Sequence, residues 1–301
     1  MQIFPVGLGT WPFGGGYDWG PVSETDVLKT VHSALDGGYN FIDTAPLYGD
    51  GESERLLGIA LRAHRKQVFL ATKCGLIKKG SWPVHDLSPA SVRKQAEESL
   101  RRLQTDFIDL YQIHYPDPHV PLADTLEVLM QLKAEGKIGR IGVCNFSAEQ
   151  LRQAVTLMPI DAVQGHLSLV QPQVTKELLP LCRQFKIPFI GYGTLEGGIL
   201  SGKYQRLAHA PNFRRADARS YFYKCYRAER FEQARAIAAR VEKIAAEHAC
   251  SPVAVAGAWA LAQAGVKVVL CGARTAQQAA ANKDAASVQL SARDITFLEG
   301  A

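Results

Sequence analysis

Four residues in the first half of the chain have the side-chain types needed for acid–base chemistry on a carbonyl group: Asp43, Tyr48, Lys73 and His114. Three of them close short apolar runs that are typical of buried strands, at residues 40–43, 68–73 and 107–114. Tyr48 follows Asp43 by five residues. If these strands are parallel neighbours, their carboxyl ends meet at one rim, where barrel enzymes keep their chemistry. The sequence therefore predicts that an acid, a phenol, an amine and an imidazole share one site.

Such a group could protonate the alkoxide that forms when a carbonyl accepts hydride. A phenol is a weak acid, with a reference pKa of about 10. An ammonium group ~4 Å away favours the phenolate by up to ~4 kcal/mol at an effective dielectric constant near 20. A buried carboxylate would keep that amine charged. We expect Tyr48 to be the general acid/base, Lys73 to lower its pKa, Asp43 to be the counter-ion of Lys73, and His114 to orient the carbonyl.

Each of the four residues alone has a simpler explanation. An aspartate after a strand usually caps a turn, a lysine there is usually solvated, a histidine is often a satisfied core side chain, and a tyrosine beside glycine is often a loop aromatic. Their joint occurrence at the ends of the second, third and fourth predicted strands favours a shared site.

Apolar β-rich runs alternate with helical patterns from end to end of the chain. The predicted strands cover Val6–Thr10, Phe41–Asp43, Val68–Lys73, Phe107–His114, Ile138–Val143, Ala162–Gln164, Pro188–Tyr192 and Val268–Cys271. The predicted helices cover Glu24–Asp36, Glu52–His64, Pro89–Leu103, Leu122–Glu135, Ala148–Val155, Thr175–Phe185, Ala228–His248, Ser251–Gln263 and Ala276–Lys283. This alternation is typical of a closed parallel barrel. We predict an α/β fold, a single (β/α)8 TIM barrel domain over residues 1–301.

Two connections are longer than a barrel requires, Cys74–Ser88 and Ser201–Arg227. Long loops at the carboxyl rim are usually lids or pocket walls. The alternative is that they are surface insertions whose aromatic side chains pack on the outer helices.

Composition excludes several other classes. The net charge of +5 is mild and its cations are scattered over predicted helices, which argues against nucleic-acid binding but suits an anionic cofactor. Six cysteines without a C-x-x-C pair predict neither a metal site nor a disulfide framework. No apolar run reaches the ~18–20 residues of a membrane helix, and no signal peptide is visible. We therefore expect a cytoplasmic protein that binds neither membrane nor metal.

Several segments resemble the aldo-keto reductase family. Asn40–Gly49 is similar to the first signature of that family, Leu110–His114 resembles the segment with its histidine, and Lys137–Phe146 resembles its nicotinamide-binding stretch. The resemblance covers essentially the whole chain. It implies an NAD(P)H-dependent oxidoreductase that reduces an aldehyde or ketone to an alcohol, or catalyses the reverse, by direct hydride transfer.

The resemblance also implies a set of cofactor contacts. The nicotinamide carboxamide would bind Cys144, Asn145 and Gln164, and Tyr192 would stack on the ring. Cys144 stands where the family usually has serine. The loop that covers the pyrophosphate would include Gly193, Thr194, Leu195 and Gly197.

The adenosine end of the cofactor would lie where the last strand runs into a helix. Gly272, Arg274, Gln278 and Asn282 are the implied contacts. A helix N-terminus attracts anions, and arginine pairs well with phosphate. Many family members have arginine where this chain has Gln278, so a 2′-phosphate would rest on Arg274. We predict that NADP(H) is favoured over NAD(H).

Three tryptophans, Trp11, Trp19 and Trp82, are predicted to line the substrate pocket. The chain ends soon after Asn282, so we expect no long carboxyl-terminal tail over an open mouth. The sequence does not distinguish among sugars, small aldehydes, keto acids and steroids as substrates.

Two other functions compete with a reductase. A regulatory, non-catalytic subunit could keep the cofactor fold, as channel-associated relatives of the family do. A barrel aldolase could use Lys73 as a Schiff-base nucleophile, but the cofactor-like segments would then have no role.

Overall fold

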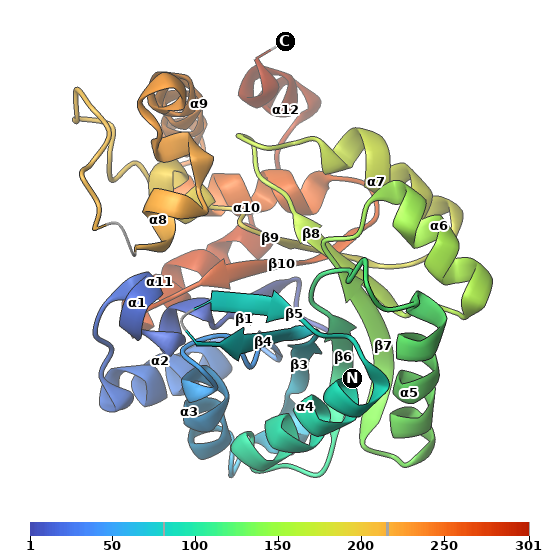
Figure 1. Ribbon diagram of the computed structural model, residues 1–301. Coiled ribbons are helices and arrows are strands. Elements are labelled where there is room, and N and C mark those ends of the chain that lie inside the picture. Colours follow the sequence, from blue (N-terminus) through green and yellow to red (C-terminus); the bar gives the residue numbers. More distant parts are fainter. Residues whose placement is uncertain (81, 215–216, 301) are drawn as a thin grey trace.

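The computed structural model describes residues 1–80, 82–214 and 217–300 (Figure 1). Eight parallel strands of this described part form a closed barrel in the order β1-β10-β9-β8-β7-β6-β3-β2. Their bounds are β1 Val6–Gly9, β2 Phe41–Asp43, β3 Phe69–Cys74, β6 Ile108–Ile113, β7 Ile138–Cys144, β8 Ala162–His166, β9 Phe189–Tyr192 and β10 Val266–Gly272. Each predicted strand lies within two residues of an observed one. The predicted (β/α)8 TIM barrel is confirmed.

Two sets of apolar side chains explain why these strands close into a barrel. One set alternates along the strands and gathers in a small cluster: Phe41, Ala71, Leu110, Ala162, Ile190, Val268 and Leu270. Their neighbours in sequence, such as Ile42, Leu70 and Val269, belong to the larger core together with residues of the outer helices. Because side chains on a strand alternate between its two faces, each strand buries one set inside the barrel and the other under the helices.

Helices follow the strands as the sequence predicts. They are α2 Glu24–Asp36, α3 Glu52–Ala60, α4 Pro89–Arg102, α5 Leu122–Ala134, α6 Ala148–Leu157, α7 Val174–Gln184, α9 Ala228–Glu247, α10 Pro252–Ala262 and α11 Ala276–Lys283. Serine and threonine caps start several of them; Ser147 and Gln150 form a capping box at α6. Helix α3 ends at Ala60, before the predicted end at His64, and a 3-10 turn at Arg65–Gln67 leads into β3.

Several short elements were not predicted. They are the helices α1 Gly16–Trp19, α8 Ala218–Tyr221 and α12 Ala292–Glu299, the strands β4 Leu76–Lys79 and β5 Trp82–His85, and the 3-10 segments η1 Trp11–Gly14, η3 Glu196–Ser201, η4 Lys224–Tyr226 and η5 Asp284–Ala286. Strands β4 and β5 pair as an antiparallel hairpin, which lies across the front of the barrel in Figure 1. The predicted loop Cys74–Ser88 is therefore partly ordered sheet. Apart from η3 and α12, these elements have three or four residues, which is too short to show a periodic apolar pattern.

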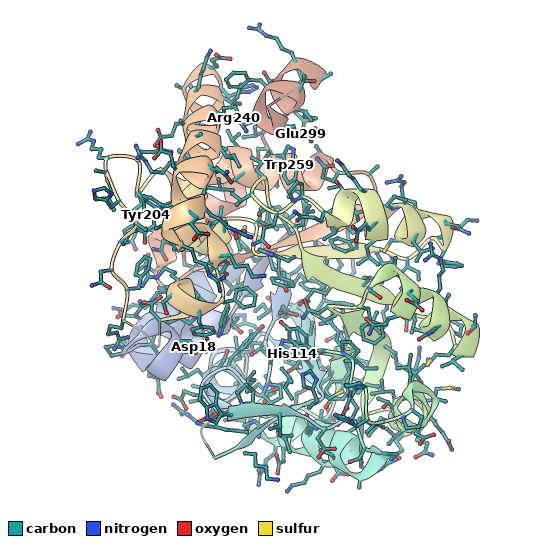
Figure 2. All side chains as sticks on the ribbon, turned by 45° about the horizontal axis from the view of Figure 1, so that its top comes forward. Asp18, His114, Tyr204, Arg240, Trp259 and Glu299 are labelled. Carbon is teal, nitrogen blue, oxygen red and sulfur yellow. The ribbon has the colours of Figure 1, made fainter. Side chains whose placement is uncertain are left out.

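Helix α12 packs beside α9 and α10 (Figure 2). The Trp259 indole Nε1 donates to Glu299 Oε1 at 3.0 Å, and Arg240 Nε donates to the Leu298 carbonyl at 3.1 Å. The side chain of Leu298 is fully buried. Among the described residues, no helix has both the length and the apolar character needed to cross a membrane.

Candidate active site

The polar residues of the candidate site continue the inward-facing positions of the strands. Asp43 follows the inward-facing Phe41 by two residues, Lys73 follows Ala71, Gln112 follows Leu110, and Gln164 follows Ala162. The period of two along a strand therefore points all four into the barrel, one layer above the apolar cluster. Strands β2, β3 and β6 are direct neighbours, with Asp43 opposite Ala71 and Lys73 opposite Gln112. Parallel strands thus bring these side chains to one rim.

Lys73 is at the centre of the predicted catalytic group. Its Nζ lies 2.6 Å from Asp43 Oδ1, 2.8 Å from the Thr44 carbonyl and 3.5 Å from the Tyr48 hydroxyl. Lys73 and Asp43 are almost fully buried. Because each charge is paired and hydrogen-bonded, the pair is compatible with burial.

Tyr48 is held by a close contact between two loops. Gly49 has φ +63°, and a Cβ there would lie 2.2 Å from the Gly14 carbonyl oxygen, so only glycine allows this approach. The Tyr48 ring stacks on Trp11 at 6.1 Å and meets the His114 ring edge-on at 6.1 Å. The phenol therefore has a defined position between Lys73, Trp11 and His114.

The pKa of Tyr48 differs from the sequence-based expectation. Burial raises the pKa of Tyr48 well above its ordinary value, and the negative charge of Asp43 adds to that effect. The net shift is therefore opposite to the expected one, although Lys73 Nζ at 3.5 Å still favours the phenolate. The physical reason is that Asp43 offsets the lysine charge while burial removes the water that would solvate a phenolate. Tyr48 is therefore a neutral proton donor at neutral pH.

His114 is a neutral imidazole. Burial lowers its pKa well below the ordinary value, and the nearby charge of Lys73 lowers it further. The side chain faces the same cavity as Tyr48. A neutral imidazole carries one N–H that can donate to a carbonyl oxygen.

A polar network extends from Asp43 towards β7, β8 and β9. Asp43 Oδ2 accepts from Gln112 Nε2 at 3.2 Å and from Gln164 Nε2 at 2.9 Å. The Cys144 thiol donates to Gln164 Oε1 at 3.4 Å. Each of these side chains is buried. The network fixes the orientation of Gln164 and connects it to the carboxylate of Asp43.

Asn145 lies beside this network. Its Nδ2 donates to the His114 carbonyl at 3.0 Å, and its Oδ1 accepts from the Tyr192 hydroxyl at 2.6 Å. Asn145 also has φ +60°, a left-handed conformation that asparagine tolerates. The structure therefore brings together the predicted carboxamide contacts and the predicted stacking tyrosine.

Most of these residues border one cavity of about 650 Å³. Its lining includes Trp11, Trp19, Tyr48, His114, Cys144, Asn145, Gln164, Tyr192, Gly193, Thr194, Leu195, Gly197, Gly272, Arg274, Gln278 and Asn282. Every predicted cofactor contact lies on it. Lys73 lies behind Tyr48 and Asp43, out of contact with the cavity.

Trp82 is the predicted pocket residue that the structure does not place in the cavity. It is 77% exposed on β5 and does not line the cavity. Because residues alternate along the hairpin, Pro83 and His85 reach the cavity wall instead. The prediction for Trp82 was wrong.

The loop after β9 suits a phosphate-bearing ligand. Thr194 lines the cavity, and its buried Oγ1 has no hydrogen-bond partner among the described residues. Gly197 has φ +63°, and a Cβ there would lie 2.8 Å from the Tyr223 ring. An unpartnered hydroxyl and a backbone free of side chains are what a bound pyrophosphate needs.

The far end of the cavity is formed by the start of α11. Thr275 caps this helix through Gln278 N. Arg274 N donates to Gln278 Oε1 at 2.8 Å, and Arg274 Nη2 donates to the Pro21 carbonyl at 2.8 Å. Arg274 thus combines a guanidinium with a helix N-terminus at one end of the cleft.

The sequence analysis missed several residues of the site. Gln112 belongs to the hydrogen-bond network of Asp43. The missed residues that line the cavity include Asp18, Leu47, Leu76, His85, Tyr115, Lys203, Arg219, Tyr221, Phe222 and Tyr223. Gln112 could have been found, since it lies two positions before His114 on the inward face of its strand. The aromatic residues of this set from 221 to 223 belong to the long loop that was predicted to form a pocket wall. Nothing local in the sequence points to Asp18 or His85.

Comparison with known proteins agrees with this geometry. The family model "Aldo/keto reductase family" matches residues 5–301. The chain belongs to the aldo/keto reductase family. The predicted family and oxidoreductase class are therefore confirmed, and a non-catalytic role is not favoured.

Relatives in this family are similar along nearly their whole length. The aldo-keto reductase YhdN of Bacillus subtilis is 37% identical over 297 residues, which are 98% of this chain and 88% of the relative. The NADH-specific methylglyoxal reductase of Escherichia coli is 35% identical over 99% of this chain and 94% of its own length. The solved glycerol dehydrogenase AKR11B4 of Gluconobacter oxydans is 36% identical, with a TM-score of 0.88 over 98% of this chain and 90% of that one.

Proposed function

We propose that this protein reduces an aldehyde or ketone to an alcohol, or oxidises the alcohol in reverse, with Tyr48 as the general acid/base. The observation that carries the proposal is the position of Lys73 Nζ. It lies between the Asp43 carboxylate and the Tyr48 hydroxyl, and both of those residues line the cavity. A nicotinamide cofactor, when bound, supplies the hydride. The residues of this chain supply the proton and the alignment.

The proton transfer follows from the electrostatics of the three side chains. Tyr48 is protonated before reaction, so its Oη can donate to a nascent alkoxide. The phenolate that remains is stabilised by Lys73 Nζ at 3.5 Å. Asp43 keeps the amine charged through its 2.6 Å contact. In the oxidative direction the same phenolate takes the proton of the alcohol.

His114 aligns the substrate. Its neutral imidazole donates to the carbonyl oxygen without adding a positive charge that would compete with Lys73. The Asn145–His114 hydrogen bond holds the backbone of His114 in place. The carbonyl is thereby directed at both Tyr48 and the cofactor site.

We propose NADP(H) as the favoured cofactor, held at its adenosine end by Arg274. The guanidinium and the start of α11 support this assignment. Gln278 leaves Arg274 as the main partner of a 2′-phosphate, and one relative is an NADH-specific enzyme. The preference is therefore modest and rests on one side chain.

The other predicted roles receive less support. A Schiff-base nucleophile must be a neutral, accessible amine, whereas Lys73 is 0% exposed and paired with Asp43. The cytoplasmic location stays a prediction.

The test is Tyr48→Phe. We expect turnover to fall by about 10²–10⁴-fold, while cofactor affinity, measured by quenching of protein fluorescence, stays unchanged. The matched control is Tyr111→Phe, which removes another buried phenol outside the cavity and should leave turnover intact. A Tyr48→Phe enzyme that keeps more than about a tenth of its rate would show that Tyr48 is not the acid.

A further inference from the structure

Charged side chains of both signs line the cavity. Lys203 and Arg274 are cations on its wall. The carboxylate of Asp18 also lines it, beside Trp11, which stacks on Tyr48. Figure 2 shows Asp18 on the short helix α1 at one side of the barrel and His114 nearer its centre.

Asp18 is held in place by two neutral donors. Trp11 Nε1 donates to its Oδ2 at 2.8 Å, and the Tyr221 hydroxyl donates to its Oδ1 at 2.7 Å. Tyr221 comes from α8, which the fold brings beside α1. Neutral donors orient a carboxylate but leave its charge uncompensated. None of the ion pairs between described residues includes Asp18.

Some cations near Asp18 are neutralised, and Arg214, which lies beside Gly20, does not line the cavity. Arg219 lies over the Trp19 ring at 5.7 Å, but its Nε and Nη2 contact the two carboxylate oxygens of Asp217 at 2.8 and 2.6 Å. Lys73 is paired with Asp43, and His114 is neutral. His85, on the opposite side of the mouth, is exposed to solvent.

The field of Asp18 reaches the reacting groups. Its negative charge is one of the causes that raise the pKa of Tyr48, after burial, Asp43, Cys144 and Tyr115. Trp11 stacks on Tyr48 and donates to Asp18, so the carboxylate lies one side chain away from the proposed acid.

We propose that Asp18 selects substrates by charge: the site takes neutral or cationic carbonyl compounds and discriminates against those with a carboxylate or phosphate group. This inference rests on the proposed function and narrows its substrate class. Among the substrates left open by the sequence, it favours neutral hydroxy-aldehydes, ketones and aromatic aldehydes over keto acids.

The test uses a matched pair of substrates, the 4-formylbenzoate anion and its neutral methyl ester. In Asp18→Asn, the amide oxygen can still accept from Trp11 Nε1 and the amide nitrogen can donate to the Tyr221 hydroxyl oxygen, so the wall is kept while the charge is lost. We expect kcat/KM for the anion to rise about three- to ten-fold relative to the ester. Raising the ionic strength should move the wild-type ratio towards that of the variant.

The control is Tyr221→Phe, which removes one hydrogen bond to Asp18 and leaves the charge. It should not change the anion-to-ester ratio, whatever it does to the overall rate. An unchanged ratio in Asp18→Asn, or an equal change in Tyr221→Phe, would overturn the proposal.

Dissociation constants of the same two compounds, from quenching of tryptophan fluorescence, separate this inference from the proposed function. If neither compound is reduced but Asp18→Asn strengthens binding of the anion alone, charge selection stands and the reductase assignment fails. If the ester is reduced and the binding ratio does not move, charge selection fails alone.

Discussion

Asp43 contacts other residues of the candidate site besides Lys73, for which it is the proposed counter-ion. One of its oxygens contacts Lys73, and the other accepts from Gln112 and Gln164. A single buried carboxylate thus keeps the amine charged and orients an amide at the proposed nicotinamide subsite. The remaining polar residues, Cys144 and Asn145, connect to it through Gln164 and through each other.

His114 leads to a pH prediction at this scale. Its folded pKa lies well below the ordinary value of 6.5, so the unfolded chain binds a proton that the folded protein does not. The contribution of His114 to the free energy of unfolding is therefore fully present above pH 6.5. It is lost as the pH falls towards the pKa of His114 in the folded protein. His114→Gln should remove this loss.

The measurement is urea unfolding at several pH values. Between pH 6.5 and 5, the wild type should lose up to about 1.4 kcal/mol per pH unit more than His114→Gln. Carboxylates with lowered pKa, such as those of Asp86 and Asp217, act at or below their ordinary value of 3.8 and lie outside this range. Replacing the exposed His119 by glutamine is the control. Equal slopes for wild type and His114→Gln would contradict a buried neutral imidazole.

At the scale of elements, connecting segments shape the cavity and strands supply most of its chemistry. The ends of β2, β3, β6, β7, β8 and β9 carry Asp43, Lys73, Gln112, Cys144, Gln164 and Tyr192. Segments η1, α1, α8 and the β4–β5 hairpin contribute the aromatic walls and Asp18. The barrel fixes the reacting groups rigidly, whereas substrate preference depends on segments that can vary without disturbing it.

The junction between β10 and α11 gives the cofactor prediction. Arg274→Ala should raise the Michaelis constant for NADPH by about ten-fold or more and change that for NADH much less, because only NADPH carries the 2′-phosphate. Initial rates at 340 nm with both cofactors measure this.

The matched control is Arg93→Ala, which removes an arginine from α4 on the outer surface. It should leave both constants unchanged. If Arg274→Ala affects NADPH and NADH equally, Arg274 does not contact the 2′-phosphate.

At the scale of the whole molecule, the closed barrel encloses an ion pair that water cannot reach. Desolvation makes such a pair costly. The attraction between the two charges compensates for this desolvation penalty only while both residues are present. The inward-facing polar layer at Asp43 and Lys73 therefore lowers the stability of the fold, and the apolar layer below it stabilises the barrel.

A double-mutant cycle tests this. Lys73→Met leaves Asp43 as an uncompensated buried charge and should cost about 3–5 kcal/mol in the free energy of unfolding. Adding Asp43→Asn neutralises that charge at nearly constant volume, so the double variant should be more stable than Lys73→Met alone. Lys94→Met, on the exposed face of α4, should have little effect. A double variant less stable than Lys73→Met would mean that the buried charge is not the source of the loss.

Much of the fold could be predicted because its signals are local. A strand is recognised by an apolar run and a helix by its period and its caps, and each of these patterns lies within about ten residues of sequence. The proposed catalytic group could be predicted in the same way, since Asp43, Lys73 and His114 each lie at or next to the carboxyl end of a strand of a parallel barrel. Tyr48 followed from the resemblance of its loop to a family signature.

The sequence by itself thus determined the barrel, the rim at which its polar residues meet and the likeness to a reductase. Only the tertiary structure decided that Trp82 faces solvent, that Asp18 meets Tyr221, and that the pKa of Tyr48 is raised. The physical reason is that these properties depend on the paths of long loops and on burial, which arise from contacts between segments up to 203 residues apart.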